Sequence, residues 1–481
     1  MHRNLLLVLL LFVFLTPVTG QQLISSTFLG SKTQAQLVSQ FGLPFIQYGA
    51  KYYRVTYTTV NVQGKLDTVS GLVGVPDDPA KVYPRLVYQH GTSGSKLDVP
   101  SYTASSGGEG SLGLLGAGFG FVSLLPDYLG LGVSDGFHPY VHAASEASVA
   151  IDLLNALPAF AAQNSVHVNN QLFITGYSQG GHASMALHRA IETDTSAPFE
   201  VTAAAHLSGP YSIGGVMRDL ILSDNIYYYP AYLPNTILSY QTVYGNLFNQ
   251  LSEVFNPPYV NIISQFYNGS ISLNTLNTQL IALLTANAGA CRPLHMLNPD
   301  MVQTIQTNPD HPFNQALRDN DVYAWAPQAP TRIFYCMADD QVPYLNSIVA
   351  RDTMLQRGAA NLVAQDVSPQ SDHGACFAPA LTTTIFFFLG YSHIETFTST
   401  ASLQMGALTL QPNPATTSVE LRNLPGEGCL RITDLNGRLQ YTAELGSGDA
   451  RVDVSGLDRG CYLLHYRTDE GIWTGKLIIQ K

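Results

Sequence analysis

A serine framed by glycines is the clearest chemical signal in the chain. Gly176 and Gly180 flank Ser178 in a Gly-x-Ser-x-Gly pentapeptide. The apolar run 172–175 precedes the pentapeptide, and a helix-like segment, 181–190, follows it. A strand, a sharp turn and a helix expose a nucleophilic serine in this context, because the glycines avoid clashes with neighbouring backbone. We therefore predict that Ser178 is a nucleophile, although a glycine-rich turn with an incidental serine would leave the same pattern.

A serine hydroxyl needs a base to remove its proton, and a carboxylate to orient that base. At a strand-turn-helix site the acid, and then the histidine, follow the serine along the chain. The apolar run 333–336 leads into Asp339 and Asp340, of which Asp339 is favoured because it lies closer to the run. His373, in the loop after the run 362–366, is the expected base. Asp340 remains the alternative acid.

An oxyanion formed by attack on a carbonyl needs two hydrogen-bond donors. The backbone N–H of Gln179, directly after the serine, is the first candidate. We expect the second from Thr92, in the loop after the apolar run 86–89, with Gly91 as the alternative. A loop with a purely structural role would also account for this segment.

Other polar residues near these segments have structural explanations. Asp127 follows an apolar run but precedes the serine, so we expect it to organise a loop, with His138 on the same rim. His182 lies in the helix after the serine and is expected to pack locally.

Short apolar runs bounded by Gly or Pro must position these groups. Several are too apolar for half-exposed strands and are typical of a buried parallel sheet. Helical segments at 145–157, ending at Pro158, and at 180–191 alternate with them, which indicates an α/β fold with helices on both faces. A β-hairpin is expected at 53–60 and 66–75. The runs are 86–89, 121–125, 172–175, 201–207, 333–336 and 362–366.

The stretch between the runs 201–207 and 333–336 is far longer than a single crossover requires. It is rich in Tyr and Phe. We predict a helical cap at about 212–325 over one end of the sheet, and a separate domain with its own core remains the alternative.

Composition and the N-terminus limit the partners and the compartment. Charged residues make up 12% of the chain, the net charge is −11 and there is no basic run, so nucleic acid is a poor candidate partner. Residues 1–20 combine a short polar start, an apolar run and small residues, as in a secretory signal peptide. A membrane anchor is the alternative, but the run is short for a span.

The cysteines indicate disulfides and no metal site. There are five, without a Cys-x-x-Cys pair or a histidine cluster, and export permits disulfides. Contact between the acid and base loops would bring Cys336 and Cys376 together. Cys429 and Cys461 could pair near the C-terminus, which leaves Cys291 free.

The pattern changes after residue 395. A polar linker is expected at 396–407, and short alternating strands between turns follow at 408–481. We predict a small all-β sandwich module there.

Residues of about 50–395 resemble the secreted lipase and esterase type of α/β-hydrolase, similar to fungal secretory lipases and their bacterial relatives. The resemblance implies a catalytic domain at 21–395 that hydrolyses esters through Ser178, Asp339 and His373 without a cofactor. It rests on His90-Gly91-Thr92, Pro126-Asp127-Tyr128, Gly176-Tyr177-Ser178-Gln179-Gly180-Gly181, Ala338-Asp339, Val342-Pro343 and Asp372-His373.

The last seventy or so residues resemble the C-terminal sorting domain of type nine secretion cargo in Bacteroidetes. The resemblance implies that the type nine secretion machinery is a partner, and that the protein is secreted or held at the outer-membrane surface. A carbohydrate-binding β-sandwich is the alternative. The matching segments are Pro412-Asn413-Pro414, Thr433-Asp434-Leu435-Asn436-Gly437, Gly460-Cys461-Tyr462 and the terminal Lys476-Leu477-Ile478-Ile479-Gln480-Lys481.

These observations together predict an exported, monomeric serine hydrolase of small-molecule or lipid carboxylic esters. A serine peptidase would use the same three residues. A non-catalytic surface binding protein would lack one of them, whereas the chain has a candidate for each.

Overall fold

The structure is a computed structural model that describes residues 22–194, 196–397, 404–435, 437–468 and 471–481. The chain divides into two compact units, Met1–Phe397 and Thr398–Lys481. The signal peptide expected at residues 1–20 lies outside the described residues. Among the described residues, no helix is long and apolar enough to cross a membrane.

A ten-stranded sheet forms the centre of the first unit, in the order β1-β2-β3-β5-β4-β6-β7-β8-β9, with β10 paired to β4. The strands from β5 to β9 in this order are parallel, whereas β1, β2 and β3 form an antiparallel edge. The predicted mostly parallel sheet is confirmed. The strands are β1 (Leu23–Lys32), β2 (Ala50–Val60), β3 (Leu66–Pro76), β4 (Lys81–Gln89), β5 (Val122–Pro126), β6 (Val168–Tyr177), β7 (Ala203–Leu207), β8 (Thr331–Tyr335), β9 (Leu362–Asp366) and β10 (Glu395–Thr396).

Helices cover both faces of this sheet. Phe173 in β6 belongs to the apolar cluster on one face, and its neighbour Ile174 belongs to the cluster on the other, because successive side chains of a strand point to opposite sides. The first face is covered by α1 (Gln34–Phe41), α3 (Ser111–Gly118) and α13 (His373–Leu389). The second is covered by α4 (Ala143–Asn164), α5 (Gln179–Thr193) and α12 (Leu345–Gln356). A short helix, α2 (Pro100–Thr103), lies between β4 and α3.

The helix expected to stop at Pro158 continues to Asn164, which corrects the prediction. A proline inside a helix removes one backbone hydrogen bond and costs about 3 kcal/mol. Pro158 lies on the exposed side of α4, whereas Phe160 and Ala161 beyond it are buried. Burial of these side chains offsets the cost, so the helix passes through the proline.

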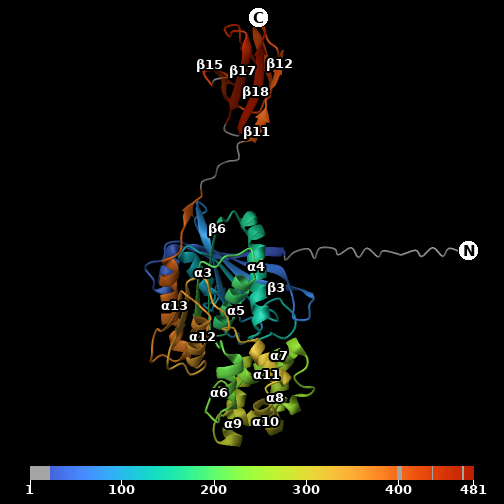
Figure 1. Cartoon of the computed structure of the whole chain (residues 1–481), viewed down its shortest axis with the longest axis vertical. Helices are drawn as coiled ribbons and strands as arrows, with labels where there is room; N and C mark the ends of the chain where they lie inside the picture. The colour runs from blue at the N-terminus through green and yellow to red at the C-terminus, as the bar shows by residue number, and fades with distance from the viewer. Residues whose placement is uncertain (1–21, 195, 398–403, 436, 469–470) are drawn as a thin grey trace, which may run out of the picture. The chain divides into compact units, whose positions relative to one another are not determined.

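The predicted cap is present, and Figure 1 shows its helices gathered at one end of the sheet. It has an apolar cluster of its own, centred on fully buried residues such as Phe255, Leu276 and Leu280. The cap nevertheless forms one compact unit with the sheet. Its elements are a π-helix (Ile213–Met217), α6 (Arg218–Leu222), α7 (Tyr232–Tyr244), α8 (Pro257–Tyr267), α9 (Leu273–Ala288), α10 (Pro299–Thr307), α11 (Pro312–Asp319) and two 3₁₀ turns, Leu251–Glu253 and Pro293–Met296.

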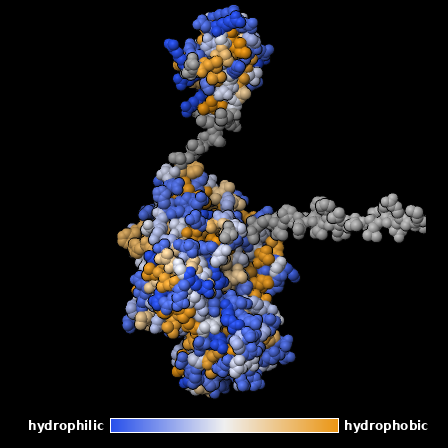
Figure 2. Space-filling model, viewed as in Figure 1, coloured by the Kyte–Doolittle hydropathy of each residue, from blue (hydrophilic) through white to orange (hydrophobic). Residues whose placement is uncertain are grey.

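The surface of the first unit mixes polar and apolar residues. On the face drawn in Figure 2, small hydrophobic patches alternate with hydrophilic surface. Scattered exposure of this kind is usual for folded proteins and does not by itself indicate a binding site.

The second unit is the predicted β-sandwich. A five-stranded sheet, β11-β18-β17-β14-β15, and a three-stranded sheet, β12-β13-β16, enclose an apolar cluster that includes Leu430, Leu464 and Leu477. The strands are β11 (Gln404–Ala407), β12 (Thr409–Gln411), β13 (Ser418–Leu424), β14 (Gly428–Asp434), β15 (Leu439–Leu445), β16 (Gly448–Asp453), β17 (Gly460–Arg467) and β18 (Gly471–Ile479).

Two expectations about this region need correction. The linker expected at 396–407 is shorter, because Thr396 pairs with β4 and Gln404–Ala407 pairs with β18. Cys429 and Cys461 are free. Cys429 lies opposite Arg467 in the sheet, six residues along β17 from Cys461, so about 20 Å of strand separates the two thiols.

Candidate active site

The candidate nucleophile lies in a strained turn between β6 and α5. Ser178 has φ 60° and ψ −121°, and Gln179 begins the helix. A Cβ atom at Gly176 would lie 2.2 Å from the carbonyl oxygen of Gly180. One at Gly180 would lie 1.9 Å from the carbonyl oxygen of Gln89 in β4. Both positions therefore require glycine, and the turn holds Ser178 at the carboxyl end of the parallel strands, partly exposed.

The candidate acid and base are joined by a short hydrogen bond. His373 Nδ1 lies 2.7 Å from Asp339 Oδ2, and both side chains are almost fully buried. The backbone N–H groups of Gln341 and Val342 donate to the other oxygen, Oδ1, at 3.0 and 2.8 Å. These donors leave Oδ2 for the ring, so Nδ1 carries the proton and Nε2 has its lone pair available.

The Nε2 atom of His373 is buried and has no hydrogen-bond partner among the described residues. The structure therefore does not join Ser178 to His373 directly. Tyr177, which precedes the serine, does contact His373: its hydroxyl donates to the His373 carbonyl, and the Tyr177 and His373 rings lie 5.0 Å apart. Hydrogen bonds of catalytic groups are often long in free enzymes and shorten only when substrate binds.

The alternative acid has a different partner. Asp340 Oδ1 accepts a hydrogen bond from the backbone N–H of His373 at 3.1 Å, whereas the ring Nδ1 is paired with Asp339. Asp340 thereby fixes the start of α13, while Asp339 orients the imidazole.

The disulfide predicted between the acid and base segments is confirmed. Cys336, directly after β8, is bonded to Cys376 in the first turn of α13. Cys291 is free and buried in the cap, also as predicted. The bridge ties the two loops that carry Asp339 and His373.

Both backbone N–H groups that are expected to bind the oxyanion are free to donate. Within the described part of the chain, the backbone N–H groups of Gln179 and Thr92 donate to no acceptor. The alternative donor, Gly91, is excluded because its N–H donates to both carboxylate oxygens of Glu109, at 3.1 and 3.0 Å. The Thr92 hydroxyl lies 3.2 Å from the hydroxyl of Tyr140.

Asp127 is not part of this group. Its carboxylate accepts from the hydroxyls of Ser70 and Ser101, both at 2.6 Å, and from the backbone N–H of Ser101. Burial raises the pKa of Asp127. The residue therefore joins β3 and α2 to the loop after β5, which is the loop-organising role expected for it.

An apolar cavity of about 80 Å³ adjoins the candidate nucleophile. Ser178 and Tyr140 contribute to it from the sheet side, and cap helices supply most of the remaining wall. The wall includes Ile213, Ile221, Leu222, Leu233, Ile237, Leu297, Phe313 and Leu317.

Cap tyrosines connect this cavity to the acid loop, a feature that the sequence analysis missed. The hydroxyl of Tyr227 donates to the Gln341 carbonyl at 2.9 Å, and that of Tyr232 donates to the Gln341 side chain at 2.8 Å. The cluster of Tyr residues in the cap was a visible signal, but tyrosine alone does not indicate which loop it contacts.

The fold is that of an α/β-hydrolase, and the arrangement of the candidate site resembles that of lipases and esterases. A glycine-flanked serine, a histidine paired with a carboxylate and free backbone donors lie at the carboxyl ends of β4, β6, β8 and β9, beneath a helical cap.

Solved structures of this type resemble the chain closely. The rice cell wall degrading esterase LipA from Xanthomonas oryzae is 28% identical, with a TM-score of 0.68 over 76% of this chain and 96% of LipA. A presumed hydrolase from Legionella pneumophila is 24% identical, with a TM-score of 0.68 over 77% and 98% of the two chains. Candida antarctica lipase A in its closed state is 16% identical, with a TM-score of 0.58 over 77% and 81%. The two last comparisons show the fold alone.

The second unit also matches a known family. Residues 409–480 match the model of the secretion system C-terminal sorting domain. This domain indicates export and a surface or secreted location. Comparison of the chain with curated proteins finds no match.

Proposed function

We propose that the chain is an exported serine hydrolase that cleaves carboxylic esters through an acyl-enzyme. The observation that carries the proposal is the 2.7 Å contact between His373 Nδ1 and Asp339, beside a serine held in a strained turn. This contact leaves His373 Nε2 as an acceptor at the carboxyl end of the sheet, where Ser178 lies. The likeness to LipA, an esterase, supports the same class of reaction.

In the first half of the reaction, the oxygen of Ser178 forms a bond to the ester carbonyl carbon while His373 Nε2 takes the hydroxyl proton. The N–H groups of Gln179 and Thr92 donate to the oxyanion. Collapse of the tetrahedral intermediate breaks the carbon–oxygen bond to the alcohol, which leaves with the proton from Nε2. Asp339 stabilises the imidazolium throughout.

In the second half, water attacks the acyl carbon and gives its proton to Nε2. The bond between Ser178 and the acyl carbon then breaks, and the proton returns to the serine. The products are a carboxylic acid and the free enzyme, so the reaction needs no cofactor.

The cavity beside Ser178 favours an ester with an apolar acyl or alcohol part. Its wall is mainly aliphatic and aromatic, and burial of each methylene group in such a site contributes about 0.8 kcal/mol. A linear or branched hydrocarbon chain is therefore better suited to it than a charged group.

Export would proceed in two steps. We propose that residues 1–20 direct passage across the inner membrane, and that the C-terminal unit is then recognised by the type nine secretion machinery. The candidate catalytic residues all lie in the first unit. A chain that ends at residue 397 should therefore hydrolyse soluble esters as well as the full chain does.

A panel of p-nitrophenyl esters from acetate to palmitate, run beside peptide anilides, tests the proposed activity. We expect ester hydrolysis, and a loss of at least about 10³-fold in kcat for Ser178→Ala. Ser184→Ala is the matched control, because Ser184 lies on α5 but its hydroxyl contacts the Gly181 carbonyl and His206. Full ester hydrolysis by Ser178→Ala, or cleavage of the anilides alone, would overturn the proposal.

A further inference from the structure

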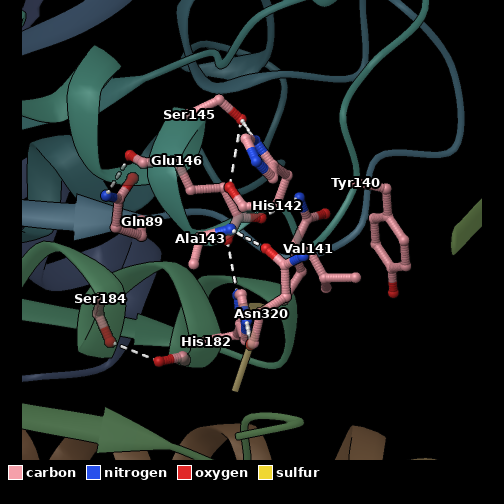
Figure 3. Close-up of polar contacts among 12 residues, drawn as sticks. Gln89, Tyr140, Val141, His142, Ala143, Ser145, Glu146, His182, Ser184 and Asn320 are labelled. Atoms are coloured by element: carbon pink, nitrogen blue, oxygen red, sulfur yellow. Dashed lines mark hydrogen bonds and ion pairs between the residues drawn. The ribbon is translucent and has the colours of Figure 1, made fainter. Parts of the chain in front are cut away.

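Glu146 and His182, both labelled in Figure 3, form a buried acidic and basic pair that contacts the side chain of Gln179. Glu146 in α4 is 1% exposed and His182 in α5 is fully buried. His182 Nδ1 lies 2.7 Å from Glu146 Oε2, and its Nε2 lies 2.9 Å from the backbone carbonyl oxygen of Asn320. A carbonyl oxygen can only accept, so Nε2 carries a hydrogen. One further proton is therefore shared between Nδ1 and Oε2, and the pair is neutral as a whole.

The second oxygen of Glu146 holds the side chain of Gln179. Gln179 Nε2 donates to Glu146 Oε1 at 2.9 Å and lies 2.8 Å from Nε2 of His138. The other nitrogen of His138 faces the carbonyl oxygen of Leu129 at 2.8 Å and so carries the ring hydrogen. Burial lowers the pKa of His138 to about 4, which keeps Nε2 free to accept.

The orientation of the Gln179 amide is therefore determined by its neighbours. Both hydrogens of its NH₂ group face acceptors, whereas its Oε1 is buried without a partner among the described residues. Rotation of the amide by half a turn would place Oε1 against the Glu146 carboxylate and lose both hydrogen bonds. An unpaired buried carbonyl costs about 1–3 kcal/mol, so the arrangement depends on the acceptors that hold the NH₂ group.

One carboxylate thus holds two residues in the first turn of α5. Gln179 and His182 are three residues apart and lie on the same side of the helix. The backbone N–H of Gln179 is the donor expected to meet the oxyanion. Fixing its side chain restricts rotation of the peptide group between Ser178 and Gln179, which is the group that must point at the developing charge.

The pairing with His182 also has an electrostatic consequence. An isolated carboxylate near the oxyanion would oppose the negative charge that develops there. Because the pair shares a proton, Glu146 can accept from Gln179 without adding a net charge to the site.

Asn320 links this hydrogen-bond network to the cap. Asn320, at the end of α11, accepts from the backbone N–H of Ala143 at 2.8 Å through Oδ1. Its Nδ2 group donates to the hydroxyl of Tyr244 in α7 at 3.0 Å. The carbonyl that faces His182 is therefore anchored to both α4 and the cap.

We propose that Glu146 and His182 are positioning residues that align the Gln179 backbone N–H for the oxyanion. The inference rests on the proposed esterase function. It goes further than the triad, because the His182 side chain holds Glu146, and Glu146 in turn holds the side chain of Gln179.

Glu146→Leu in the full chain tests this role. Leucine offers no acceptor, so neither Gln179 nor His182 keeps its hydrogen bond to this side chain. Glu146→Gln should instead keep kcat within about 3-fold, because the amide oxygen can accept from Gln179 while its NH₂ group donates to Nδ1 of a neutral His182. Loss of a whole oxyanion donor costs about 10²–10³-fold in kcat. For a misaligned donor we expect a loss of about 10–100-fold in kcat, with KM changed by less than about 3-fold. Affinity for a trifluoromethyl ketone, whose serine adduct places an oxyanion in the site, should fall by a similar factor.

Asp152→Leu is the matched control. Asp152 is a second buried carboxylate on α4, 3% exposed, that accepts from the hydroxyl of Thr59 at 2.6 Å and does not contact Gln179. It should keep kcat within about 2-fold, even where its melting temperature falls. A merely structural role for Glu146 predicts the same behaviour in both variants.

Gln179→Met provides a second measurement, because it retains the backbone N–H and removes the amide that Glu146 holds. It should also lower kcat, and its combination with Glu146→Leu should be no less active than the less active of the two single variants. If Glu146→Leu does not fold, Gln179→Met carries the same expectation. Unchanged kcat in folded Glu146→Leu and Gln179→Met, or a loss equal to that of Asp152→Leu, would overturn the inference. Absence of ester hydrolysis in the unmodified chain would instead refute the proposed function.

Discussion

Replacing Asp339 by Asn would remove the charge that orients His373 and leave the side chain's shape nearly unchanged. Asp339 Oδ1 accepts from the N–H groups of Gln341 and Val342, and Oδ2 lies 2.7 Å from His373 Nδ1. The asparagine amide can keep the two backbone hydrogen bonds only by turning its NH₂ group toward Nδ1. The ring proton must then move to Nε2, which can no longer take the serine proton.

The size of the loss follows from this change of tautomer. In the best-studied serine triad the equivalent substitution lowers kcat by about 10⁴-fold, or about 5 kcal/mol of transition-state stabilisation. We expect a loss of about 10³–10⁴-fold in kcat for Asp339→Asn, with a small change in KM, in hydrolysis of p-nitrophenyl butyrate at neutral pH.

Asp340→Asn is the control for this prediction. Asp340 accepts from the His373 backbone N–H, which an amide oxygen can also do, so kcat should stay within about 5-fold of that of the unmodified chain. A larger loss for Asp340→Asn than for Asp339→Asn would place the acid one position further along the chain and refute the assignment.

Three further predictions concern stability and the cavity. The disulfide between Cys336 and Cys376 closes a loop with a sequence separation of 40, so replacing both residues by Ser should lower the free energy of unfolding by about 4 kcal/mol. A melting temperature that a reductant leaves unchanged would contradict this. Ile221→Trp should narrow the cavity and reduce kcat/KM for octanoate esters at least about 10-fold more than for acetate, whereas the exposed Ile226→Trp should affect both esters equally. Burial lowers the pKa of His142 to about 4. The unfolded chain, with a pKa of about 6.5 for this group, therefore binds more protons, and the stabilisation present above about pH 6.5 is lost as the pH falls toward 4. His142→Gln should flatten that fall, by up to about 1.4 kcal/mol per pH unit, in urea unfolding measured across this range; a slope equal to that of the unmodified chain would refute it.

The parallel strands could be predicted because burial on both faces leaves a continuous apolar run. The run 362–366 coincides with β9, and the run 333–336 begins two residues after the start of β8 and ends one residue after its end. The edge strand β1 lacks this signal, because all of its residues are exposed or half-exposed. Pro158 was misleading for the opposite reason. Its local preference was overridden by tertiary packing, which the sequence of one segment does not contain.

The sequence identifies the residues that are expected to react better than it identifies the residues that are expected to position them. Ser178 is recognisable because the turn that exposes it is local: Gly176 and Gly180 are required by backbone atoms that any such turn brings close. Glu146 carries no such signal. It lies 33 residues from Gln179, on a different helix, and the same residue type is usually a solvated surface group. Only the packing of α4 against α5 places it there, so a carboxylate that supports the site becomes visible only once its burial and its partners are known.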